Sequence, residues 1–114
     1  MIDAHTRILL EDMRDHANDA LNYIGGLDVE IFSETRVMIH AATRAAEIVG
    51  EAASQIKSDV RQANPSIPWR RIIDMRNKLI HGYRSLQPKT LFETIHNHFP
   101  PLIAEIERLL NANP

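Results

Sequence analysis

The residues best suited to chemistry lie in one stretch past the middle of the chain, Arg76-Asn77-Lys78-Leu79-Ile80-His81-Gly82-Tyr83. A histidine can donate or accept a proton near neutral pH. An arginine can pair with a phosphodiester and with the negative charge that develops on it during cleavage. Such a pair without a metal motif suits RNA cleavage, because the RNA 2′-hydroxyl is a built-in nucleophile that needs only to be deprotonated.

The spacing of these residues limits how they can act together. Arg76 and His81 are five residues apart, which is about 140° around a helix, so they would flank a ligand from two sides. Asn77 stands four residues before His81 on one stripe, so its amide could orient the imidazole. A structural alternative stays open, in which Arg76 pairs with a carboxylate and His81 caps carbonyl groups at a helix end.

The pKa of His81 is subject to two opposing effects. A helix C-terminus stabilises the imidazolium, and the nearby cation of Arg76 destabilises it. The sequence leaves the direction of the shift open. In either direction, the imidazole can exchange a proton near neutral pH.

The other five histidines do not form a metal-binding pattern. His5 and His16 would lie about 16 Å apart along a helix, and His96 and His98 would point to nearly opposite sides. His40 has no acidic residue or histidine three or four positions away. We therefore expect no metal and no cofactor.

The formal charge of −2 hides an uneven distribution along the chain. Residues 57–89 contain eight positive and two negative side chains, a net +6, whereas the rest contains five positive and thirteen negative ones, a net −8. This cluster is either a solvated set of helix faces or a local anion-binding surface. For the second interpretation, the candidate RNA contacts are Arg70, Arg71, Lys78 and Arg84.

Length and composition are those of an ordinary small globular protein. The 114 residues are 44% hydrophobic and 25% charged, which predicts one compact helical domain over residues 1–114. The absence of cysteine excludes disulfides, thiolate zinc sites and a thiol nucleophile. We expect a cytoplasmic protein without membrane contact, since no apolar run approaches about 20 residues and no signal-peptide pattern is present.

Apolar residues recur with helical spacing throughout, and no segment alternates as a strand does. The predicted fold class is all-α, an up-and-down bundle of four to five helices. One helix is expected from Asp3 to Ile24, ended by Gly25-Gly26, and Asp28 can cap the next. The remaining helices are predicted over 35–63, from Pro68 to a stop at Gly82, and from Pro88 to about Leu110 with a kink or restart at Pro100-Pro101.

Several blocks of residues occur in a specific order along nearly the whole chain. They are Ile48-Val49-Gly50-Glu51-Ala52, Asn64-Pro65, Ile67-Pro68-Trp69, Arg76-Asn77, Leu79-Ile80-His81-Gly82-Tyr83 and Phe99-Pro100-Pro101-Leu102. In this order the chain resembles the HepT-like toxins, small members of the HEPN superfamily. It departs modestly from their pattern at Phe92 and at Arg84-Ser85-Leu86.

The resemblance implies a two-fold homodimer and a metal-independent ribonuclease whose arginine and histidine line a cleft between subunits. By position, Arg76 would hold the scissile phosphate and His81 would act as general base or acid, with Asn77 supporting the site. Tyr83 matches the tyrosine that a cognate nucleotidyltransferase antitoxin modifies with AMP. Glu51 either hydrogen-bonds near the cleft or is an exposed helix acid.

Two other functions stay open. HEPN proteins also include non-catalytic nucleotide- or partner-binding subunits of nucleotidyltransferases, and the basic segment could serve such a role. A dimeric scaffold with a degenerate site is a further alternative, and the presence of Arg76, His81 and Tyr83 argues against it.

Overall fold

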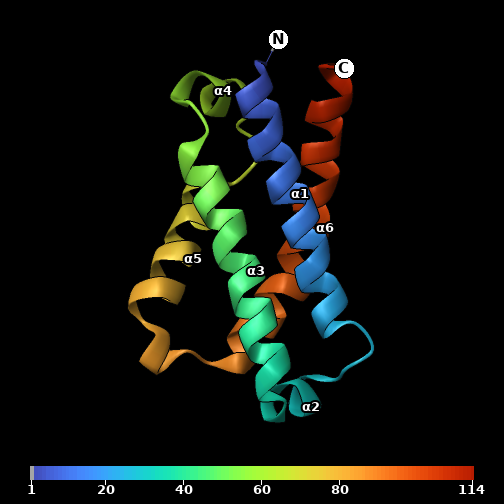
Figure 1. Ribbon diagram of the computed structural model, residues 1–114, viewed down its shortest axis with the longest axis vertical. Coiled ribbons are helices and arrows are strands. Elements are labelled where there is room, and N and C mark those ends of the chain that lie inside the picture. Colours follow the sequence, from blue (N-terminus) through green and yellow to red (C-terminus); the bar gives the residue numbers. More distant parts are fainter. Residues whose placement is uncertain (1) are drawn as a thin grey trace.

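The computed structural model describes residues 2–114 and is built from helices (Figure 1). No strand occurs within this range, so the predicted all-α class is confirmed. Four helices are long and two have six residues each, and a short 3₁₀ segment precedes the last helix. In chain order they are α1 (Ala4–Ile24), α2 (Val29–Glu34), α3 (Arg36–Gln55), α4 (Ser58–Ala63), α5 (Trp69–His81), η1 (Tyr83–Ser85) and α6 (Pro88–Ala112).

The first two helices begin where the local sequence predicts. The Asp3 carboxylate accepts a hydrogen bond from the Thr6 amide at 2.7 Å, and Asp28 accepts one from the Ile31 amide at 2.9 Å. Each bond satisfies an amide that the first helical turn leaves unpaired. Gly26 has a φ of +78°, a conformation that glycine adopts without steric cost, and it lies in the turn that follows α1.

The helix predicted as continuous over 35–63 is interrupted, and that prediction was wrong at one point. Ile56 has extended backbone (φ −66°, ψ 132°) and a buried side chain, and it separates α3 from α4. Lys57 follows it and places its Nζ 2.7 Å from Oδ2 of Asp3 at the start of α1. The Lys57–Asp3 contact joins segments far apart in sequence, so helical periodicity alone could not predict the break.

The last helix passes through Pro100 and Pro101 without ending, so the restart considered at this point does not occur. Prolines remove helical hydrogen bonds and favour a change of direction. In Figure 1 the first part of α6 runs obliquely behind α3, and its second part runs upright beside α1. The second part of α6 therefore continues the apolar stripe, with its helix axis in a different direction.

The hydrophobic core lies between α1, α3 and α6, and α5 packs on α3 from the other side. Small residues of α3 allow its neighbours to approach closely, among them Ala42, Ala45, Ala46 and Ala53, which are buried. Direct contact between α5 and α6 is slight by comparison. The larger core side chains are Leu9, Leu10, Met13, Phe32, Val49, Ile56, Ile67, Trp69, Ile72, Leu79, Leu91, Ile95, Phe99, Leu102 and Ile106.

Candidate active site on helix α5

Helix α5 carries most of the predicted site, and the loop before it fixes where the helix starts. The Trp69 indole N–H donates to the Asn64 carbonyl at 3.0 Å, and the Trp69 side chain is buried. Pro68 precedes the first helical residue, and Gly82 follows the last one, as the sequence predicts to within one residue. The amide of Gly82 donates to the Lys78 carbonyl at 2.8 Å. Together these contacts set the position of α5 at both ends.

The crossing of α3 and α5 explains a glycine inside a long helix. A Cβ atom added at Gly50 would collide with Cβ of Arg76 and would lie 3.0 Å from both Cγ of Arg76 and the carbonyl oxygen of Ile72. The Arg76 side chain therefore lies directly over Gly50. Glycine costs about 1 kcal/mol in a helix interior relative to alanine. Here the missing side chain provides the space that the base of Arg76 occupies.

The guanidinium of Arg76 is held by two neighbours. Its Nη2 lies 2.7 Å from Oε2 of Glu51 on α3, and its Nη1 donates to Oδ1 of Asn77 at 3.0 Å. Its Nε is buried and has no hydrogen-bond partner within residues 2–114. The side chain is 28% exposed, so the guanidinium is fixed at its base and still reachable from solvent. A phosphate approaching it would compete with the Glu51 carboxylate.

The sequence left open whether Arg76 pairs with a carboxylate, and the structure answers this question. Arg76 does pair with a carboxylate, and Glu51 contacts the arginine although half of its side chain is exposed. Asn77 bonds to Arg76 instead of His81, so the expected orientation of the imidazole by this amide was wrong. The reason is that the planar guanidinium lies within reach of the amide, one residue away.

His81 is the last residue of α5, and its side chain is exposed. Within residues 2–114 it makes no side-chain hydrogen bond, and thus it does not cap carbonyl groups. No hydrogen bond joins it to Arg76 either, in keeping with their separation of about 140° around the helix. One copy of the chain therefore presents the two groups on different sides of α5.

Tyr83 begins the short 3₁₀ segment two residues after His81 and is 66% exposed. The segment is held by Ser85, whose hydroxyl donates to the Gly82 carbonyl at 3.0 Å, and by the Leu86 amide, which donates to the Tyr83 carbonyl at 3.3 Å. The backbone around Tyr83 is thus held by hydrogen bonds, while its side chain is accessible from solvent.

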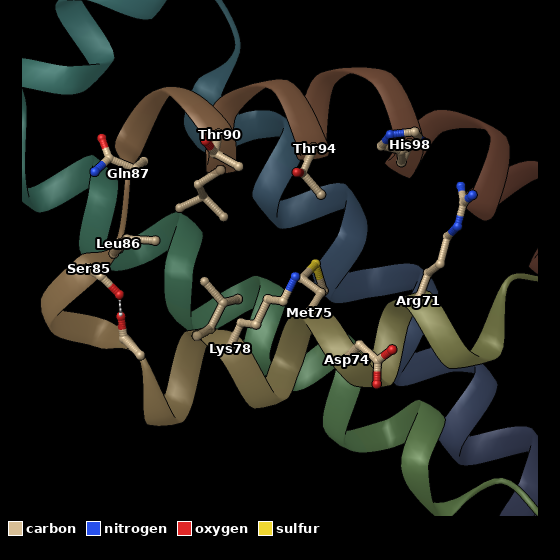
Figure 2. A pocket seen from close by; sticks show the side chains of 13 residues that line it. Arg71, Asp74, Met75, Lys78, Ser85, Leu86, Gln87, Thr90, Thr94 and His98 are labelled. Carbon is tan, nitrogen blue, oxygen red and sulfur yellow. Dashed lines mark hydrogen bonds between the residues drawn. The ribbon is translucent and has the colours of Figure 1, made fainter.

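The four candidate RNA-binding cations are all exposed, but they do not form one cluster. Arg71 and Lys78 line a groove of about 540 Å³ between α5 and α6 (Figure 2). Arg70 lines a different hollow, beside α4 and the loop before α5. Arg84 lies in η1 and lines neither. Arg71 also lines the hollow that Arg70 lines, so no single surface feature gathers more than two of the four.

The groove itself was missed by the sequence analysis. Its opposite wall includes Thr90, Thr94 and His98, which follow one another every four residues on α6. This spacing places polar side chains on a single helix face, and it is the signal that could have pointed to the groove. The distance between α5 and α6, which opens the groove, follows from packing and has no signature in the sequence.

Two further observations concern metal binding and membrane-spanning helices. Among residues 2–114, no three histidine, aspartate or glutamate side chains gather closely enough to hold a metal ion. No helix in the same range combines the length and apolar character needed to cross a membrane.

Comparison with known proteins identifies the family of the chain. No solved structure matches the chain significantly. A protein of Methanocaldococcus jannaschii named "Putative RNase MJ0125" is 31% identical over 104 residues, which cover 91% of this chain and 90% of the relative. "Probable ribonuclease HepT" of Thermococcus cleftensis is 41% identical over 69 residues, or 60% of this chain and 63% of the relative. The family model "Ribonuclease HepT-like" matches residues 13–109, so the chain belongs to the HepT-like ribonuclease family.

Proposed function

We propose that this protein is a metal-independent endoribonuclease, the toxin of a prokaryotic toxin–antitoxin pair, which acts in the cytoplasm. One observation carries the proposal. Arg76 is fixed by Gly50, Glu51 and Asn77, and the same helix ends in an exposed His81 that has no hydrogen-bond partner within residues 2–114. This arrangement offers a positioned cation and an available acid–base group, the two functions that cleavage by the 2′-hydroxyl requires.

The proposed reaction is a transesterification. His81 removes the proton from the 2′-hydroxyl, and the 2′-oxygen attacks the adjacent phosphorus while Arg76 pairs with the negative charge of the phosphorane. The bond from phosphorus to the 5′-oxygen breaks, and that oxygen takes a proton from an imidazolium. The products are a 2′,3′-cyclic phosphate and a 5′-hydroxyl. No oxidant, reductant or metal is needed for this balance.

A homodimer would bring the two groups together. In one chain Arg76 and His81 point to different sides of α5, so a single copy provides an incomplete site. A two-fold axis near α5 would place Arg76 of one copy near His81 of the other, and the two imidazoles could then share the roles of base and acid. This model predicts that mixing the inactive variants Arg76→Ala and His81→Ala restores some cleavage.

The regulation that fits Tyr83 is modification with AMP by a nucleotidyltransferase antitoxin. In that step the phenol oxygen attacks the α-phosphorus of ATP and releases pyrophosphate. Support comes from the 66% exposure of Tyr83 and from its place two residues after His81. The attached nucleotide would add a negative charge beside the cations of the site and obstruct RNA.

A second candidate function is a non-catalytic nucleotide- or partner-binding subunit of a nucleotidyltransferase. The ion pair between Arg76 and Glu51 favours it, because an arginine already paired with a carboxylate can have a purely structural role. The two functions predict different results with purified protein, because a ribonuclease cleaves RNA and a binding subunit leaves it intact.

The deciding experiment is RNA cleavage by the purified protein in the presence of EDTA. We expect cleavage by wild type and a loss of at least about a thousandfold in Arg76→Ala and His81→Ala. Arg44→Ala and His5→Ala are matched controls, since both residues are exposed and lie on other helices, and they should cleave as wild type does. Intact RNA in every sample would refute the ribonuclease and favour the binding subunit.

A further inference from the structure

The groove between α5 and α6 has the properties of a nucleotide-binding site. It arises because α5 packs on α3 and α6 packs on α1, which leaves the facing sides of α5 and α6 apart. Its volume of about 540 Å³ lies within the roughly 300–1,000 Å³ of small-molecule sites. Figure 2 shows Thr90 and Thr94 pointing from α6 toward Met75 and Lys78 on α5.

The chemistry of the groove matches a base joined to a phosphate. Buried Leu79 and Leu91 form part of an apolar floor, which suits the face of a nucleobase. The hydroxyls of Thr90 and Thr94 have no hydrogen-bond partner within residues 2–114, and each can donate to or accept from the edge of a base. The lining thus combines an apolar surface with polar groups that are available for a ligand.

The charges at the rim favour a nucleic acid as the occupant. Arg71, Lys78 and His98 are exposed there, and Asp74 is the one acidic residue of the lining. Arginine and histidine also stack on unpaired bases. A second copy of the chain docked there about a two-fold axis would bring Arg71 and Lys78 of both copies into one interface, and like charges placed together are unfavourable.

The groove reaches the residue that follows the proposed catalytic histidine. Lys78 stands one helical turn before His81, and Gly82 directly after it also lines the groove. A nucleotide held there would therefore be a near neighbour of the phosphate at His81. A chain bound from the groove to His81 must be single-stranded, because a paired base cannot enter.

From these observations we propose that the α5–α6 groove binds one nucleotide of single-stranded RNA next to the cleaved phosphate. The assignment rests on the proposed ribonuclease function. The base lies on the apolar floor between the two helices, and Arg71 and Lys78 bind its flanking phosphates.

The test uses full-length protein carrying His81→Ala, which can bind RNA without cutting it, and a short fluorescent single-stranded RNA of mixed sequence. Thr94→Trp fills the groove and should weaken binding roughly tenfold, the loss expected for one stacked base. Asn97→Trp is the matched control, because Asn97 is exposed on α6 and does not line the groove. Equal affinity of the two variants would overturn the proposal.

A second pair keeps the test valid if the tryptophan variant does not fold. Lys78→Gln should lower the affinity and reduce the salt dependence of binding by close to one phosphate contact. Lys89→Gln makes the same charge change on an exposed lysine outside the groove and should have less effect. Equal losses in both lysine variants would mean a diffuse electrostatic effect and would overturn the groove assignment.

The failure of this proposal is distinguishable from that of the proposed function. If wild type cleaves RNA and the groove variants bind RNA as their controls do, the ribonuclease stands and the groove assignment falls. If wild type leaves RNA intact while Thr94→Trp still weakens binding, the groove binds RNA and the catalytic function falls.

Discussion

The two sides of α5 differ in how closely they meet the rest of the protein. On one side α5 presses against α3 so tightly that Gly50 has no room for a Cβ atom. On the other side it stands away from α6 and leaves a groove of about 540 Å³. The tight side holds Arg76 through its close contacts with Gly50 and Glu51. The open side has space and available polar groups, as a site for a ligand requires.

The largest expected effect comes from removing a core side chain on the tight side. Ile72, whose carbonyl oxygen faces Gly50 of α3, has a buried side chain, and Ile72→Ala should lower the free energy of unfolding by about 2–5 kcal/mol. Met75→Ala, half-buried at the groove, should cost clearly less because water can fill the space. Urea unfolding of both variants measures the difference, and equal losses would show that the two sides of α5 are alike.

Gly50→Ala tests the tight crossing itself. The new methyl group forces α3 and α5 apart, a cost of about 1–3 kcal/mol that the better helix propensity of alanine offsets by about 1 kcal/mol. Because Arg76 lies over this position, cleavage should also fall, by roughly tenfold or more. Ser54→Ala, on an exposed face of α3, is the control. Unchanged stability and cleavage in Gly50→Ala would contradict the role given to this contact.

Glu51→Gln tests whether the Glu51 carboxylate positions the guanidinium of Arg76 or only competes with RNA for it. If it positions the guanidinium, kcat falls roughly tenfold, while stability changes by less than about 1 kcal/mol because the pair is partly exposed. Glu47→Gln, whose carboxylate lies 3.7 Å from Arg44 on the same helix, is the matched control. A lower KM with unchanged kcat would mean that Glu51 only competes with the phosphate.

The smallest effect is expected far from both sides of α5, at the start of α1. Lys57 and the amide of Thr6 hold the pKa of Asp3 well below its usual range. A lowered pKa in the folded state means that the stabilisation is present above the unfolded pKa of about 3.9 and is lost as the pH falls below it. Asp3→Asn should therefore lower Tm slightly at pH 7, and the difference should vanish in acid.

The measurement is the Tm of wild type and of Asp3→Asn, taken from pH 7 down to acid pH below about 3.9. Since the ion pair is exposed, added salt should shrink the difference at pH 7. Equal Tm values at pH 7 and low salt would show that the contact between α1 and Lys57 contributes nothing to stability.

The sequence predicted those parts of the fold that depend on local signals. Asp3, Asp28, Gly25-Gly26 and Gly82 mark helix ends because each acts on backbone groups within a few residues. The break at Ile56 could not be predicted, since it depends on burial of that side chain and on the distant Asp3.

The candidate site likewise has features that the sequence predicted and features that it could not predict. The motif around Arg76 and His81 was visible as residue types at a fixed spacing. The bond from Asn77 to Arg76 instead of His81 depends on side-chain conformation, which spacing does not determine. The groove depends on how far α6 lies from α5, a result of packing on α1 and α3.

The most direct test of the central claim is the chemistry of the RNA ends made by the purified protein in EDTA. Attack by the 2′-hydroxyl under the action of Arg76 and His81 predicts fragments with 2′,3′-cyclic phosphate and 5′-hydroxyl ends. These ends should be absent from samples of His81→Ala. Fragments with 3′-hydroxyl and 5′-phosphate ends, or wild-type cleavage that His81→Ala retains in full, would contradict the account.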